Sequence, residues 1–305
     1  MRVTQRMMVE NSVKDMSDSL STYNDLMQKT SGGKKFRWAS DDTSNAVSAL
    51  SLRSTLEKQD AYIDTGNTTK LWMDTTDGAI VSMQGIAARA INLTMEGFAD
   101  TMGEDQRKAI SHEIDMMITQ AVAIGNSRHM GNYIFSGFQT NTKPFDLVKG
   151  TYPVPPGTPD SVIFNGDNGS IQRNIGPQQS MTVNLSGSLF NGAGHDVFTA
   201  LIQTRDALST NNRAGAEEGL RNLQNVTSYL NNQRVEYAGK ERELQTNIDR
   251  METTKIQLRS FLSGKEDVNM AEAISYLKQQ ETVYQTVLSV SNRAMSLANL
   301  FERMG

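Results

Sequence analysis

Residues 223–258 read LQNVTSYLNNQRVEYAGKERELQTNIDRMETTKIQL, and this stretch decides the fold. Apolar side chains recur in it every seven residues, at Leu223, Leu230, Tyr237, Leu244, Met251 and Leu258. A repeat of this length keeps one stripe of an α-helix facing a partner helix. The alternate stripe is weaker, since Val226, Ile248 and Leu262 are separated by charged residues. The pattern predicts a long helix packed within a bundle rather than a two-stranded zipper.

Both ends of the chain carry a seam of apolar residues whose spacing alternates between four and three. Near the amino end the members are Val9, Val13, Met16, Leu20, Tyr23 and Met27. Near the carboxyl end they are Val283, Val287, Val290, Leu297, Phe301 and Met304, with Ala294 between them. An isolated helix of this length is marginally stable until its apolar face is buried. Each end therefore needs a partner, in this chain or another, and these residues form the predicted assembly interface.

A short window rich in proline and glycine interrupts the helical pattern. All six prolines lie between Pro144 and Pro177, and the window holds short β-like pieces at 161–164 and 180–185. We therefore expect a mainly α, elongated coiled-coil rod with one small inserted β domain. The expected parts are a terminal coiled-coil layer (1–40 with 265–305), a helical bundle rod (41–138 with 195–264) and the β domain (139–194). Confinement to one insertion predicts that the β domain is dispensable for the helical seams.

Turn and capping residues set the expected helix ends. The first helix should stop at Gly32–Gly33, because glycine tolerates the left-handed turn that ends helices. Asp41 and Asp42 should cap the next helix rather than form a catalytic carboxylate pair. Near the carboxyl end, Gly264 should stop a helix and Asp267 or Asn269 should cap the last one.

Composition points to protein partners. Of the 305 residues 37% are hydrophobic, the net charge is −4, and the 30 basic and 34 acidic residues are interspersed. No basic patch suggests nucleic acid, and no stretch approaches the length of a membrane span. The first eight residues, MRVTQRMM, lack the apolar run of a signal peptide. If the protein leaves the cell, we expect a dedicated exporter.

The sequence contains few features of a catalytic, cofactor or metal site. Cysteine is absent, and the three histidines, His112, His129 and His195, lack a metal-ligand spacing. Gly33–Lys34 is not a phosphate loop, since Gln28 stands where the first glycine belongs. Asp167 begins an Asp-Asn-Gly run that is typical of a β-turn rather than a calcium loop. We therefore expect a non-catalytic protein with no cofactor.

Two sets of residues resemble the flagellin superfamily. Ser31–Lys35, Ala39–Asp42, Arg53 and Asp77–Ala79 look like the amino-terminal signature of bacterial flagellins. The stretch from Glu266 to Met304 is similar to the matching carboxyl terminus. Arg128 and the run Gly131–Phe138 resemble the subfamily that joins the flagellar hook to the filament. The chain departs from many relatives at Thr43, where they have proline, and in the proline-rich segment 152–159.

The resemblance implies a structural subunit that is secreted through the flagellar type III export apparatus. It implies an extracellular place at the hook-filament junction, reached through helical self-assembly of the terminal helices. Implied partners are further copies of the chain, hook-associated protein 1 below, flagellin above, and an export chaperone that holds the carboxyl-terminal helix. A filament flagellin is the alternative, which the run 132–138 disfavours.

Overall fold

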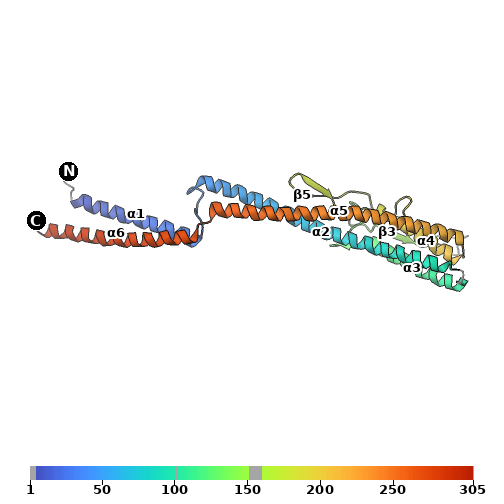
Figure 1. Cartoon of the computed structure of the whole chain (residues 1–305). Helices are drawn as coiled ribbons and strands as arrows, with labels where there is room; N and C mark the ends of the chain where they lie inside the picture. Colours follow the sequence, from blue (N-terminus) through green and yellow to red (C-terminus); the bar gives the residue numbers. More distant parts are fainter. Residues whose placement is uncertain (1–4, 100–101, 151–159, 305) are drawn as a thin grey trace. The chain divides into compact units, whose positions relative to one another are not determined.

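Long helices dominate the computed structural model, which describes residues 5–99, 102–150 and 160–304. At residues 5, 6, 8, 294, 295 and 297–304 only the backbone is described. The helices are α1 (Gln5–Gly32), α2 (Thr43–Gly97), α3 (Glu104–Gly125), α4 (Val197–Ser209), α5 (Arg213–Glu266) and α6 (Met270–Met304) (Figure 1). The predicted mainly α fold is confirmed. Within the described ranges, no helix combines the length and apolar character needed to cross a membrane.

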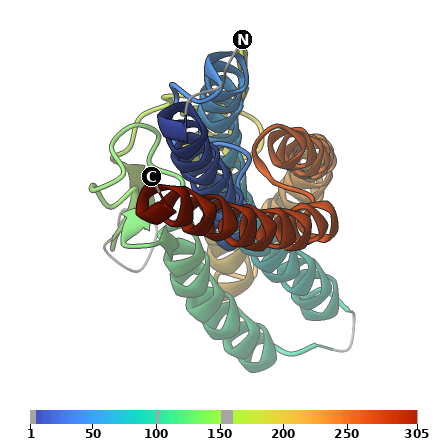
Figure 2. The same ribbon diagram turned by 90° about the vertical axis from the view of Figure 1, so that its left-hand side faces the viewer.

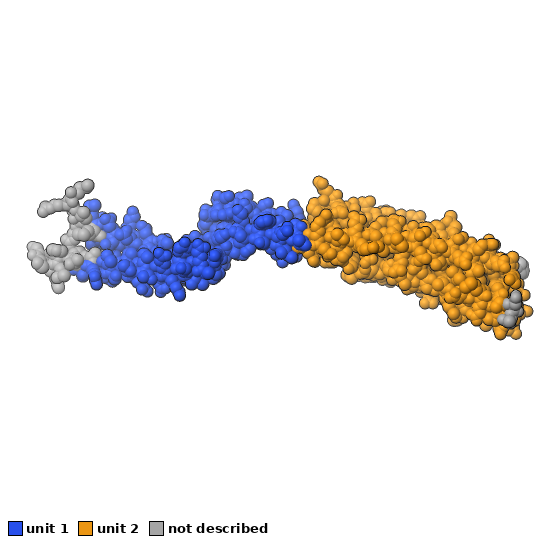
Figure 3. Space-filling model, viewed as in Figure 1, with its two compact units in different colours: residues 1–58, 253–305 blue, residues 59–252 orange. Residues whose placement is uncertain are grey.

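The chain divides into two compact units (Figure 3). Unit 1 comprises residues 1–58 and 253–305, and unit 2 comprises residues 59–252. Helices α2 and α5 contribute residues to both units. This division differs from the three parts expected from the sequence, because the β segments pack with the helices of unit 2.

In unit 1 most of the residues predicted to end or cap a helix do so. Gly33 adopts a left-handed φ of +64° directly after α1. Asp42 accepts a hydrogen bond from the backbone N–H of Asn45 at 3.0 Å and caps α2. Asn269 does the same for α6 by accepting from Ala271 at 3.2 Å. The predicted stop at Gly264 is wrong: α5 continues to Glu266, where backbone pairing with the residues after α1 redirects the chain.

The heptad stripe that opened the sequence analysis is the core of unit 2. Its members from Leu223 to Met251 are all buried. They face α2, while α3 packs against α4 to complete the helical layer. The helix expected to resume at about residue 196 is broken in two, since Asn211 has a left-handed φ of +53°. Asn212 then accepts a hydrogen bond from Gly215 at 3.1 Å at the start of α5.

The strands between α3 and α4 form three antiparallel pairs within the described residues. They are β1 (Arg128–His129) with β2 (Asn132–Tyr133), β3 (Phe145–Val148) with β4 (Ser161–Phe164), and β5 (Gln172–Gly176) with β6 (Gln179–Thr182). The predicted strand at 161–164 is β4, and the predicted strand at 180–185 overlaps β6. A two-stranded hairpin alone is marginally stable, so each pair depends on the helices that it covers.

Aromatic side chains join the strands to the helical core. The Phe145 ring of β3 lies 4.9 Å from Phe198 of α4 and 6.4 Å from Phe190, and the Phe135 ring lies 4.7 Å from Phe190. All four side chains are buried in the cluster that contains Leu223 and Leu230 of the α5 stripe. Removal of residues 139–194 would therefore open the core of unit 2, and the prediction that the β domain is dispensable for the helical seams stays a prediction.

The β5–β6 hairpin is tied to α5 by buried hydrogen bonds. The Tyr237 hydroxyl donates to the carbonyl of Val183 at 2.8 Å, and the Asn247 amide donates to the carbonyl of Ile175 at 2.6 Å. Burial raises the pKa of Tyr237 far above its ordinary value. The hydroxyl therefore stays protonated and keeps its role as a donor.

Candidate assembly interface

Helices α1 and α6 pair with each other in an antiparallel arrangement, side by side in Figures 1 and 2. Gln280 donates to the carbonyl of Ser19 at 3.3 Å, and Ser291 donates to the carbonyl of Ser12 at 3.4 Å. The partner number on α6 rises as the number on α1 falls, which defines the antiparallel direction. The Tyr23 and Tyr284 rings also stack across the pair, with their centroids 6.1 Å apart. The two terminal helices thus find a partner within one chain.

The pairing uses only one flank of the predicted seam of α1. Val9, Met16 and Tyr23 are partly buried, as are Ser12 and Leu26, and Ser19 is buried. Val13, Leu20 and Met27 remain 47%, 39% and 48% exposed. On a helix, positions 12, 19 and 26 lie on the other side of the shared residues from 13, 20 and 27. The small serines let the helices approach, and the larger apolar row is left uncovered.

Helix α6 carries a matching uncovered row. Tyr276, Val283 and Val290 follow one another at seven-residue spacing and are 53%, 41% and 59% exposed. Val283 also lines a shallow hollow of about 370 Å³ together with Val287, which is partly buried. The side chains of Leu297, Phe301 and Met304 lie outside the described residues. Tyr276 was not among the predicted interface residues, although its seven-residue spacing to Val283 and Val290 makes it part of the same row.

A cluster of charged residues holds the residues after α1 against the turn between α5 and α6. Lys34 Nζ lies 3.1 Å from the Glu266 carboxylate and 2.6 Å from that of Asp267, and Arg53 lies 2.8 Å from Glu266. The backbone N–H of Lys35 donates to the carbonyl of Glu266 at 2.7 Å. We call Lys34, Lys35, Arg53, Glu266 and Asp267 the loop clamp. Lys34 thus pairs with two carboxylates.

The electrostatics of the loop clamp favour its charged form. Burial alone would raise the pKa of Glu266, but hydrogen bonds from Arg53 and Lys34 hold it below its ordinary value. The hydrogen bond from Lys34 also lowers the pKa of Asp267, and the same contact raises the pKa of Lys34. The carboxylates therefore stabilise the clamp above about pH 4.5, and their contribution is lost as the pH falls through their lowered values.

We expect the amide hydrogen of Lys35 to show constant protection, after correction for intrinsic rates, between about pH 5 and pH 9. Protection should fall below about pH 4 as Glu266 and Asp267 take up protons. Glu266→Gln should lower the protection of the Lys35 amide at neutral pH. It should also make the fall in protection below about pH 4 shallower. Hydrogen exchange followed by mass spectrometry measures both. If the fall in protection at acid pH were the same in Glu266→Gln as in the parent, a group other than Glu266 would determine the pH dependence of this turn.

The residues considered for chemistry do not converge. His195 stacks on Tyr229 at 3.6 Å, His129 lies against Trp72 at 5.7 Å, and His112 is exposed. Asp167 accepts hydrogen bonds from the backbone of Phe138 and Gly169, both at 2.7 Å, which confirms its turn role. Among the described residues, no group of three or more His, Cys, Asp or Glu side chains could hold a metal ion.

Comparison with known proteins links this geometry to a family. Residues 3–140 match the model of the bacterial flagellin N-terminal helical region. Flagellar hook-associated protein 3 of Salmonella typhimurium is 23% identical over 197 residues, which cover 63% of this chain and 57% of that protein. Flagellar hook-associated protein 3 of Escherichia coli is 25% identical over 154 residues, covering 50% of this chain and 48% of that protein. The match thus spans about half the length of these relatives.

A solved structure supports the fold. The crystal structure of FlgL from Bacillus cereus superposes with a TM-score of 0.59 at 16% identity, covering 70% of this chain and 99% of that chain. At this identity the likeness establishes the helical architecture. The amino-terminal match, the two relatives and this architecture agree with one another. The amino-terminal part of the chain thus matches the bacterial flagellin N-terminal helical region, and the chain as a whole resembles flagellar hook-associated protein 3.

Proposed function

We propose that this chain is a structural, non-catalytic subunit of the bacterial flagellum that joins the hook to the flagellin filament. The observation that carries the assembly mechanism is the pair of uncovered apolar rows, Val13/Leu20/Met27 on α1 and Tyr276/Val283/Val290 on α6. Covering such a side chain in a neighbouring subunit is worth about 1.5–3 kcal/mol when burial is complete. The two rows on each subunit would therefore hold a ring or helical array together.

In this proposal, the two flanks of a terminal helix make different contacts. The serine-lined flank of α1 holds α6 within the subunit, and the larger apolar flank meets a neighbouring copy. Loop clamp contacts keep the antiparallel pair joined to α2 and α5. The predicted seam residues beyond the described side chains, Leu297, Phe301 and Met304, would extend the same surface.

The proposal places the chain outside the cell, between hook-associated protein 1 and flagellin, after export through the type III apparatus with a chaperone on its carboxyl-terminal helix. The family resemblance supports these partners. Antibody labelling of detached hook-filament preparations tests the location: label confined to the junction supports the proposal. Label along the whole filament would favour the alternative, a filament flagellin, and absence of label would contradict both.

Val290→Asp should block assembly while leaving the monomer folded. Val290 is 59% exposed, so the unfolding free energy of the monomer should change by less than about 1 kcal/mol. In the assembly the new carboxylate would be buried without a partner, at a cost of several kcal/mol. Thermal unfolding of the purified monomer and filament retention in a complemented motile cell measure the two effects.

Gln285→Glu provides the matched control, because it adds the same charge about 140° around α6 from Val290. This exposed position should tolerate the change in both measurements. Filament retention by Val290→Asp at the level of Gln285→Glu would show that the α6 row makes no contact in the assembly.

A further inference from the structure

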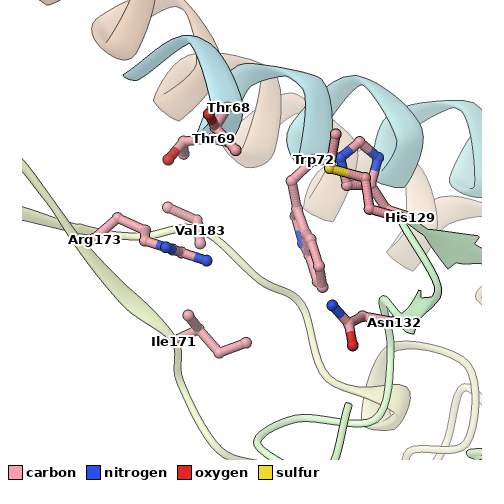
Figure 4. A pocket seen from close by; sticks show the side chains of 9 residues that line it. Thr68, Thr69, Trp72, His129, Asn132, Ile171, Arg173 and Val183 are labelled. Carbon is pink, nitrogen blue, oxygen red and sulfur yellow. The ribbon is translucent and has the colours of Figure 1, made fainter. Parts of the chain in front are cut away.

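A small cavity in unit 2 lies where three elements meet. Its volume is about 100 Å³, and it is lined from α2, from the β1–β2 hairpin and from residues in and beside the β5–β6 hairpin. Figure 4 shows the Trp72 indole extending from α2 between Arg173 on one side and His129 on the other, with Asn132 near its far edge. Aromatic, amide and cationic side chains thus surround one space.

Unpaired polar atoms are concentrated at this cavity. Trp72 Nε1 and His129 Nε2 are buried and lack a hydrogen-bond partner within the described residues, and both residues line the cavity. Buried polar atoms in folded proteins are nearly always satisfied, so each exception needs an explanation, of which a bound molecule is one. Arg173 is the only cation in the lining, and no described carboxylate pairs with it.

The neighbouring contacts define what each atom can bind. Thr75 Oγ1 donates to the carbonyl of Leu71 at 2.8 Å and lies 3.0 Å from His129 Nδ1. When the threonine proton stays on this carbonyl, Nδ1 of the neutral imidazole donates to Thr75 Oγ1 and Nε2 is an acceptor. Trp72 Nε1 is a donor only, and Arg173 supplies further donors and a positive charge. The cavity therefore combines an anion-binding side with one acceptor.

We propose that this cavity binds a small hydroxycarboxylate. Its carboxylate accepts from Trp72 Nε1 and Arg173, and its hydroxyl donates to His129 Nε2. The volume admits about three water-sized groups, which limits the ligand to a short-chain acid such as lactate. Charge-assisted hydrogen bonds are the strong ones, so Arg173 supplies affinity, while His129 supplies the preference for a hydroxyl. This site goes beyond the proposed structural role and does not depend on it.

The test uses the full chain with Trp38→Phe, which leaves Trp72 as the only one of the two tryptophans. Lactate, propionate and lactamide are titrated while the fluorescence and the indole N–H resonance of Trp72 are recorded. Lactate should give a saturable change in both signals. Propionate lacks the hydroxyl and lactamide lacks the charge, and each should bind at least about fivefold more weakly.

Two variants test the separate roles of Arg173 and His129 in lactate binding. Arg173→Gln should weaken lactate binding at least about tenfold, whereas the matched control Arg221→Gln, at an exposed position of α5, should leave it unchanged. His129→Phe should remove the preference for lactate over propionate. No saturable response to lactate, or equal binding by Arg173→Gln and the parent, would overturn the proposal. A crystal structure grown with lactate that shows only water in the cavity would do the same.

Discussion

Replacing Arg205 by methionine is expected to lower the unfolding free energy by about 3–5 kcal/mol, the cost of breaking a buried ion pair by removing one partner. Its side chain is 7% exposed and lies 2.7 Å from Asp115, Asp160 and Asp206. The Asp160 side chain is fully buried, and Lys149 is its other cationic neighbour, at 3.2 Å. Without the guanidinium, Asp115 and Asp160 would share that lysine, and Asp206 would lose its ion pair with Arg205.

The effect of Arg205→Met should depend on pH. Burial alone would raise the pKa of Asp115, but Arg205 and Lys149 hold it below its ordinary value of 3.8. Burial raises the pKa of Asp206, and Arg205 offsets this only in part. The lowered Asp115 value contributes stability above about pH 4 that is lost as the pH falls through it. The difference between variant and parent should therefore be largest near neutrality and shrink below about pH 4.

Denaturant unfolding across this pH range measures the effect. Arg89→Met is the matched control, because Arg89 forms an exposed ion pair with Glu113. The Arg89 side chain is 56% exposed and the Glu113 side chain 39%, and exposed pairs contribute about 0–1 kcal/mol. Adding Asp160→Asn to Arg205→Met should recover part of the loss, since it removes a buried unpaired charge. Equal losses for Arg205→Met and Arg89→Met would contradict the predicted role.

Leu244→Asp should destabilise unit 2 by at least about 4 kcal/mol, which is enough to unfold many domains. Leu244 is fully buried in a cluster with Tyr237 and Ile248 of α5 and Ile63 of α2. The change removes about 1.5–3 kcal/mol of burial, and the new carboxylate must be desolvated or take up a proton. Circular dichroism during thermal and denaturant unfolding of the monomer measures the loss.

Val235→Asp separates burial from charge. Val235 lies on the same helix but is 69% exposed, so the same substitution type should cost less than about 1 kcal/mol there. A monomer in which both variants unfold at the parent's midpoint would show that the heptad stripe of α5 is not the core of the unit. Loss of stability in Val235→Asp alone would contradict the assigned faces of the helix.

Much of the helical fold follows from local patterns. The heptad from Leu223 to Met251 identified a buried stripe correctly, because burial on a helix repeats with the helix itself. Gly33 and Asp42 act at helix ends as their backbone and side-chain chemistry predicts. The same signals failed at Asn211, where a left-handed residue between two helical patterns divides α4 from α5. Such a break leaves the flanking periodicity almost unchanged.

The sequence by itself determined the helices, their approximate ends and the family signature, because these depend on residues close together in the chain. Tertiary structure decided which flank of α1 meets α6, since Ser19 was a better fit for close packing than Leu20. It also brought Lys34 to Glu266, 232 residues away, and placed Phe145 in the helical core. These outcomes depend on long-range shape and charge complementarity, and short-range periodicity carries no information about either.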